Sequence, residues 1–100
     1  MKKDACCDLI EMLCNKTRFS IIKSLRNKEK NVSELSRELK VNQTTISHNL
    51  AKMQECDVII AEQKKKFRYY RIKSEYVIPI LELAEKHARK YCHEHRRWTT

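Results

Sequence analysis

The sequence predicts a small, mainly α-helical domain that carries one two-stranded β-hairpin, and three observations support this fold class. Apolar residues recur every three or four positions over most of the chain, the spacing that places them on one face of a helix. Between 58 and 72 this spacing ends, and two runs rich in β-branched and aromatic residues flank a basic turn at 63–66. With 100 residues and no internal repeat, the chain has room for one domain with a modest core.

Two helix-start signals lie close together in the middle of the chain. Asn31 precedes Glu34 by the spacing of a capping box, and a short apolar face follows. After a tight connection at 40–41, Asn42 can cap a second helix over about 43–55. Two helices joined by so short a turn and followed by a hairpin predict a winged helix-turn-helix, in which the hairpin is the wing.

Three further helices complete the expected element order. One is expected over 3–15 and another over 18–26, with Thr17 as the N-cap of the second. A last helix is expected over 75–95, and a basic tail follows at 96–100. The apolar stripe of this last helix is long for a helix that lies on so small a body, so we expect it to need a partner. The whole chain, 1–100, is thus predicted to be a single winged-helix domain.

The charge balance is strongly basic. The 22 Lys and Arg residues exceed the 13 Asp and Glu residues and give a net charge of +9, which favours polyanionic partners such as nucleic acid or an acidic membrane surface. No apolar run is long enough to span a membrane, and the charged N-terminus does not resemble a signal peptide. The five cysteines do not form a disulfide pattern. We therefore expect a cytoplasmic protein that does not associate with membranes.

An enzyme is not expected. The chain has no glycine, which excludes the glycine-rich loops that bind phosphate groups in many nucleotide-dependent enzymes. The predicted fold would assemble neither a pair of catalytic carboxylates nor a Ser/His/Asp arrangement.

The helix over 43–55 has a polar face opposite its apolar stripe. Small or amide-bearing side chains on this face can donate and accept hydrogen bonds, as the reading of base edges in a major groove requires. The candidate base-contacting residues are Gln43, Thr44, Thr45, Ser47, His48 and Lys52. The basic wing at 63–68 adds candidate phosphate contacts, namely Lys64, Lys65, Lys66 and Arg68. The alternatives are an ordinary solvated helix face and a hairpin whose lysines discourage aggregation.

Four segments carry a recognisable pattern. They are Thr17-Arg18-Phe19-x-Ile21-Ile22-x-x-Leu25, Val32-x-Glu34-Leu35-x-x-x-Leu39, Gln43-Thr44-Thr45-Ile46-Ser47-x-x-Leu50 and Arg68-Tyr69-Tyr70-Arg71-Ile72. In order and spacing they resemble the ArsR/SmtB family of small dimeric winged-helix repressors, over roughly residues 9–90. Asn49 stands where that family usually has His, and Cys56-Asp57 where it usually has Ala-Gly. Asp tolerates a left-handed backbone better than most residues, so Asp57 could still make the turn.

The resemblance implies a homodimer in which the last helix packs with the first across a two-fold axis. The residues expected at this interface are Leu9, Leu13, Val77, Ile80, Leu81, Ala84, Ala88 and Tyr91. Such a dimer would bind double-stranded DNA with an inverted-repeat operator. We therefore expect a sequence-specific transcriptional regulator, most simply a repressor. The alternatives are a winged helix that binds protein or RNA, and a protein that coats DNA without specificity.

Many members of the resembled family carry metal sites, but two of the familiar sites are not supported here. The third-helix motif Cys-Val-Cys-Asp-Leu corresponds to 31–35, which has no thiol, and the zinc pattern of the last helix fails because Trp98 replaces its second His. A looser ligand set that could hold zinc or another soft metal ion is Cys6, Cys7, Cys92, His93 and His95. One alternative is that these side chains bind no metal. The others are that Cys6, Cys7 or Cys14 acts as a redox switch, and that the regulator responds to no effector.

Overall fold

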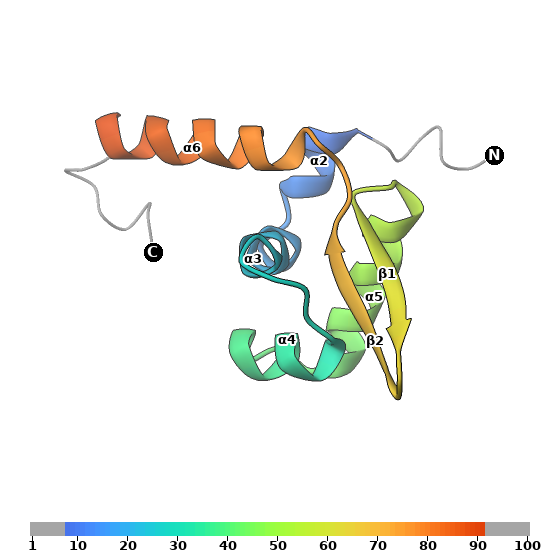
Figure 1. The fold of residues 1–100 in the computed structure, drawn as a ribbon. Coiled ribbons are helices and arrows are strands. Elements are labelled where there is room, and N and C mark those ends of the chain that lie inside the picture. Colours follow the sequence, from blue (N-terminus) through green and yellow to red (C-terminus); the bar gives the residue numbers. More distant parts are fainter. Residues whose placement is uncertain (1–7, 92–100) are drawn as a thin grey trace.

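The computed structural model describes residues 8–91, which form a winged helix-turn-helix. The elements are α2 (Leu9–Leu13), α3 (Lys16–Leu25), α4 (Val32–Leu39), α5 (Gln43–Glu55), β1 (Ile59–Lys64), β2 (Phe67–Ile72) and α6 (Val77–Tyr91). Helices α2 and α6 lie at one end of the molecule, and α4 lies near the other end beside the tip of the hairpin (Figure 1). The predicted fold class is confirmed. Among the described residues, no helix has the length and apolar character needed to cross a lipid bilayer.

The first two helices begin at residues other than those predicted. Asp8 has an extended backbone, and its carboxylate accepts hydrogen bonds from two N–H groups in the first turn of α2 at 3.1 and 3.3 Å. The prediction of one continuous helix over 3–15 is therefore wrong, because Asp8 is the N-cap of α2. Asn15, not Thr17, caps α3, since its side chain accepts from the backbone N–H three residues later at 3.0 Å.

The helix-turn-helix begins as predicted. Asn31 and Glu34 form a complete capping box with hydrogen bonds of 2.8 and 3.0 Å. Asn42 caps α5 by accepting a hydrogen bond from the Thr45 N–H at 2.8 Å, and the helix then covers the predicted range. These local caps fix where each helix starts and thus which side chains fall on each face.

Within residues 8–91, three non-glycine residues have a left-handed backbone. They are Lys40 (φ 59°), Asp57 (φ 59°) and Lys65 (φ 56°). Asp57 makes the turn between α5 and the hairpin, as we expected from its tolerance of this conformation. Because the chain has no glycine, each of these three positions holds a residue with a β-carbon. The left-handed conformation costs such a residue roughly 1–2 kcal/mol.

We expect Lys40→Gly to raise the free energy of unfolding by about 0.5–1 kcal/mol. Glycine adopts the left-handed backbone without steric cost, although part of this gain is lost through the greater freedom of the unfolded chain. Denaturant unfolding measures the effect. Lys66→Gly is the matched control, because it removes the same side chain at a turn residue whose φ is not positive. A Lys40→Gly protein no more stable than this control would contradict the prediction.

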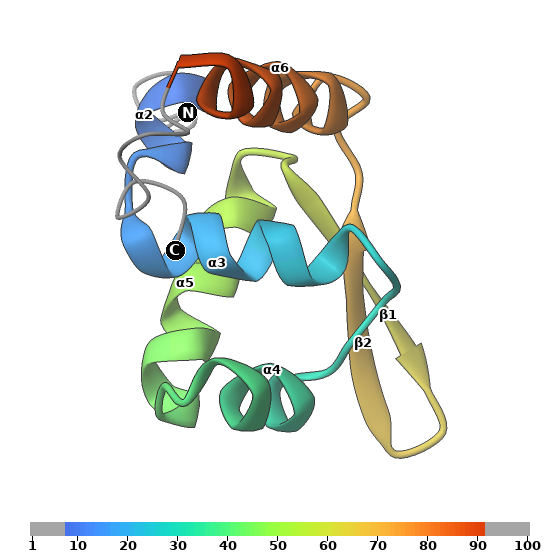
Figure 2. The same cartoon turned by 90° about the vertical axis from the view of Figure 1, so that its left-hand side faces the viewer.

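One apolar core joins the helices to the hairpin. Its largest fully buried side chains are Ile21, Ile22, Leu35, Ile46, Leu50, Met53, Ile59, Val77 and Leu81. Helix α3 passes across α5 (Figure 2), and the two contribute several of these residues. The predicted stripe of Ile46, Leu50 and Met53 is buried, which directs the opposite face of α5 to solvent.

The hairpin is anchored to the loop between α3 and α4. Its strands pair antiparallel as far as Lys64 and Phe67, so the turn is shorter than the predicted 63–66. Lys30 and Tyr70 exchange backbone hydrogen bonds of 3.1 and 2.9 Å, which hold the loop beside β2. This contact joins segments far apart in sequence and places the wing next to the start of α4.

The ammonium group of Lys30 also ties α3 to α4. Its Nζ donates to the Ser24 hydroxyl at 2.7 Å and to the Glu38 carboxylate at 2.9 Å. Hydrogen bonds from Lys30 and Ser24 lower the pKa of Glu38 below its usual value. The loop that carries Lys30 is therefore fixed both by its backbone and by its side chain.

Candidate nucleic-acid interface

The polar face of α5 forms one continuous exposed surface. Its exposed side chains are Gln43, Thr44, Ser47, His48 and Lys52, while Thr45 is half-buried. These positions recur three or four residues apart, so they share the side of the helix that the core leaves open. The structure thus brings the predicted base-contacting residues together, and we call this surface the reading face.

The wing presents three of its four predicted cations directly to solvent. Lys65, Lys66 and Arg68 are exposed at or beside the turn. Lys64 differs because its ammonium group forms an ion pair with the Glu29 carboxylate in the loop before α4. This hydrogen bond raises the pKa of Lys64, and both side chains remain partly exposed. In the DNA-free protein, one wing cation is therefore already engaged.

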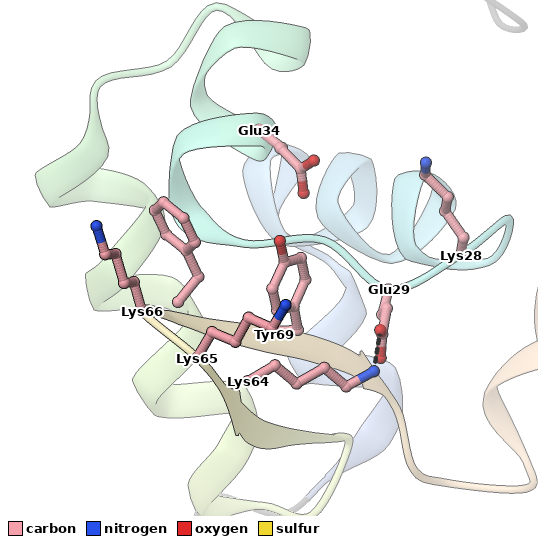
Figure 3. A pocket seen from close by; sticks show the side chains of 8 residues that line it. Lys28, Glu29, Glu34, Lys64, Lys65, Lys66 and Tyr69 are labelled. Carbon is pink, nitrogen blue, oxygen red and sulfur yellow. Dashed lines mark hydrogen bonds and ion pairs between the residues drawn. The ribbon is translucent and has the colours of Figure 1, made fainter.

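An open groove of about 670 Å³ lies between the wing and the start of α4 (Figure 3). It is lined by Lys28, Glu29, Glu34, Lys64, Lys65, Lys66, Phe67 and Tyr69. Figure 3 shows Tyr69 in the middle of the groove, with Lys28 and Lys66 on opposite sides. Four cations against two carboxylates give the groove a positive balance, which suits the phosphates of a DNA backbone.

Lys28 is a candidate phosphate contact that was not predicted from the sequence. Its loop has the composition of an ordinary polar connection, with no local signal of a binding site. The loop that carries Lys28 is held beside the wing by the pairing of Lys30 with Tyr70, a contact between positions forty residues apart in the chain. A regular spacing of basic residues along the sequence could have suggested Lys28 as a candidate. It would not have shown where Lys28 lies relative to the wing.

Part of the predicted dimer interface is buried inside the protomer. Val77 and Leu81 have no exposed surface, and Leu13 is also buried, so these three side chains belong to the core. They would not contact a partner, which corrects their predicted role. The other predicted interface residues, Leu9, Ile80, Ala84, Ala88 and Tyr91, are half-buried or exposed.

A second apolar stripe of α6 is left uncovered by the protomer. Leu83 and Tyr91 are 66% and 62% exposed, and Ile80 and Ala84 lie beside them at helical spacing. Ile10 of α2 is 60% exposed at the same end of the molecule. We call these five residues the apolar face. Monomeric proteins rarely leave such patches uncovered, so this surface suits a protein partner.

Helix α6 is held on the body by a bidentate ion pair. Two guanidinium nitrogens of Arg26, the C-cap residue of α3, donate to the Glu85 carboxylate at 3.0 and 2.8 Å. The pair raises the pKa of Arg26 and lowers that of Glu85, as expected when each charged form is stabilised by the other. The four residues of the apolar face that lie on α6 are therefore on a helix that is held in a fixed orientation on the body.

The candidate metal ligands Cys6, Cys7, Cys92, His93 and His95 lie outside the described residues. Within 8–91, no three His, Cys, Asp or Glu side chains are grouped so that they could hold a metal ion. Of the cysteines in this range, Cys14 is exposed and Cys56 is half-buried.

Comparison with known proteins identifies the family. Residues 15–61 match the model of the family described as "Bacterial regulatory protein, arsR family". The helix-turn-helix is an arsR-family domain. The matched range covers α3, α4 and α5, so it contains the whole helix-turn-helix and the reading face. No curated protein sequence matches the chain significantly.

Solved structures of transcriptional regulators share the fold of this chain. HlyU from Vibrio vulnificus CMCP6 is 28% identical, with 78% of this chain and 81% of that chain covered and a TM-score of 0.73. The transcriptional repressor PagR of Bacillus anthracis is 28% identical, with 83% and 93% covered and a TM-score of 0.71. The homodimeric winged helix-turn-helix DNA-binding domain of Mb0332 from Mycobacterium bovis is 26% identical, with 87% and 81% covered and a TM-score of 0.77.

The arsR-family assignment confirms the resemblance found in the sequence. It also confirms the predicted function class, which is a DNA-binding transcriptional regulator and not an enzyme.

Proposed function

We propose that this arsR-family protein is a homodimeric, sequence-specific repressor that inserts α5 into the major groove of an operator. The observation that carries the proposal is the reading face. The first turns of α5 carry four exposed side chains, those of Gln43, Thr44, Ser47 and His48. The opposite side of this helix packs in the core. By occupying a promoter, such a protein would most simply block transcription.

The side chains of the reading face suit direct contact with bases. A glutamine such as Gln43 can make two hydrogen bonds to adenine, and the hydroxyl groups of Thr44 and Ser47 can pair with several base edges. No carboxylate interrupts this part of α5, so the helix can approach the negatively charged groove. These features favour DNA over a protein partner for this surface.

The wing and the groove beside it would contact the DNA backbone or the minor groove. Lys65, Lys66 and Arg68 are exposed near the end of the hairpin, and Lys28 faces the same groove. Phosphate contacts of this kind position a protein on the duplex without reading sequence. The wing would thus supply affinity, while α5 would supply specificity.

The apolar face supports a two-fold dimer through α2 and α6. A patch that contains Ile10, Leu83 and Tyr91 would be covered if a second copy packed against it. The Mb0332 domain, which shares this fold, is described as homodimeric. A two-fold dimer would place two α5 helices about one DNA turn apart and would favour an inverted-repeat operator.

A fluorescence-anisotropy titration tests the proposed function. The duplex from upstream of the protein's own gene is compared with a shuffled duplex of equal length, at several salt concentrations and with reductant. We expect a preference of roughly 10³-fold or more for the native duplex. Equal, salt-sensitive binding to both would indicate a DNA-coating protein. Binding to neither would favour a protein- or RNA-interaction module.

We expect Glu29→Gln to strengthen binding to both duplexes and to steepen its salt dependence. The substitution releases Lys64, and one added phosphate contact changes the slope of log K against log salt by about −0.9. The measurement is the same titration over a salt series. Glu55→Gln is the matched control, because it removes the same charge from an exposed residue for which the described structure shows no ion pair. Identical slopes for the two variants would contradict a role for Lys64.

A further inference from the structure

Arg18 joins three segments of the fold through its side chain. From the first turn of α3, its Nε donates to the carbonyl oxygen of Met12 in α2 at 2.8 Å. Its Nη1 donates to the Oδ1 atom of Asn49 in α5 at 3.1 Å. Both acceptors are uncharged, so these contacts are not ion pairs. They connect the neighbouring helices α2 and α3 with α5, whose Asn49 lies 31 residues after Arg18.

Asn49 extends this connection to the start of α5. Its side chain is almost fully buried, and its Nδ2 donates to the carbonyl oxygen of Thr45 at 2.9 Å. Thr45 belongs to the first turn of the helix, next to Gln43 and Thr44. Both ends of the Asn49 amide are therefore used, one toward Arg18 and the other toward the turn that begins the reading face.

We propose that Arg18 is a positioning residue that fixes the first turn of α5 relative to α2. Helix α2 also carries Ile10 of the apolar face, so the connection runs from the proposed dimer surface to the proposed base-reading turn. The inference rests on the proposed function, because it assigns to Arg18 the placement of the reading face on DNA.

The chemistry of arginine suits this role. The guanidinium group is planar and holds its N–H donors in a rigid fork, so two acceptors bound to it are kept at a fixed separation. A lysine ammonium at the same position would have no such fork. Loss of the fork should affect hydrogen bonds to base edges, which depend on geometry, more than contacts to phosphates, which depend chiefly on charge.

Variants of the full chain test the inference with the same two duplexes. Arg18→Met removes both hydrogen bonds, and Asn49→Ala breaks the connection from the other side. Lys16→Met is the matched control, because it removes the same charge from an exposed residue in the first turn of α3. We expect the preference for the native duplex to fall about tenfold in Arg18→Met and in Asn49→Ala, but not in the control.

Three further results are expected if Arg18 positions α5. The double variant should lose no more preference than either single variant, because both break one connected path. Arg18→Lys, which keeps the charge without the fork, should not restore the preference. Amide hydrogen exchange of residues 43–47 in the DNA-free protein should become faster in Arg18→Met and Asn49→Ala only.

The outcomes separate this inference from the proposed function. If the wild-type protein binds both duplexes equally, the proposed function fails, and amide exchange alone decides whether Arg18 holds the first turn of α5. If Arg18→Met does not fold, Asn49→Ala provides the measurement. Folded variants with an unchanged preference and unchanged exchange at 43–47 would overturn the inference, even if their thermal midpoints are lower.

Discussion

Leu83→Glu is expected to convert the proposed dimer into a monomer and to weaken binding to the native duplex by about 100-fold or more. Leu83 is 66% exposed in the protomer, in the stripe of α6 that faces away from the body. A two-fold interface contains each substituted residue twice, so two carboxylates would be buried without partners. The monomer would then bind a single half-site, without the second reading helix.

Light scattering at micromolar concentration measures the mass of this variant, and the anisotropy titration measures its binding. Arg89→Gln is the matched control, because it changes the net charge by the same amount at an exposed residue on the other side of α6. A Leu83→Glu protein that remains dimeric would place the interface elsewhere. A monomer that still binds the native duplex with wild-type affinity would contradict the need for a dimer.

Gln43→Ala is expected to cost about 1–3 kcal/mol on the native duplex, which corresponds to roughly 5–150-fold in affinity. Gln43 is the first residue of α5 and is exposed, so its amide can make two hydrogen bonds to one base. Alanine can make neither bond, whereas contacts to phosphates are unchanged. Binding to the shuffled duplex should therefore change little.

Gln63→Ala controls for the loss of a glutamine near DNA. Gln63 lies in the wing, is exposed, and donates its side-chain N–H to the Lys65 carbonyl at 3.2 Å. Its removal should affect both duplexes equally, if it affects either, because the wing is proposed to contact the backbone. An equal loss on both duplexes in Gln43→Ala would remove Gln43 from the base-reading set.

The helix-turn-helix could be predicted from sequence because its signals are local. The capping box of Asn31 and Glu34 and the cap at Asn42 each act over three residues, and both are present in the structure. The start of α3 was predicted wrongly, with Thr17 as its N-cap, because two residues that can cap a helix lie close together. Asn15 and Thr17 are both able to cap a helix, and no local rule decides between them.

Contacts between distant segments could not be predicted in the same way. Periodicity identifies the apolar residues of α6 but not the neighbour that covers each one, so Val77 and Leu81 were assigned to a partner and belong to the core. The pairing of Glu29 with Lys64 and of Arg18 with Asn49 joins residues 35 and 31 positions apart. Neither pairing leaves a pattern in the sequence.

The turn before α5 and the turn of the wing are built without glycine, at Lys40 and Lys65. Glycine would give these turns more conformations in the free protein, and the freedom lost on docking would count against affinity. Residues that have a β-carbon restrict the backbone of the free protein, before it binds DNA. The strain accepted at these positions during folding therefore leaves a preorganised surface, for which binding requires little further loss of backbone entropy.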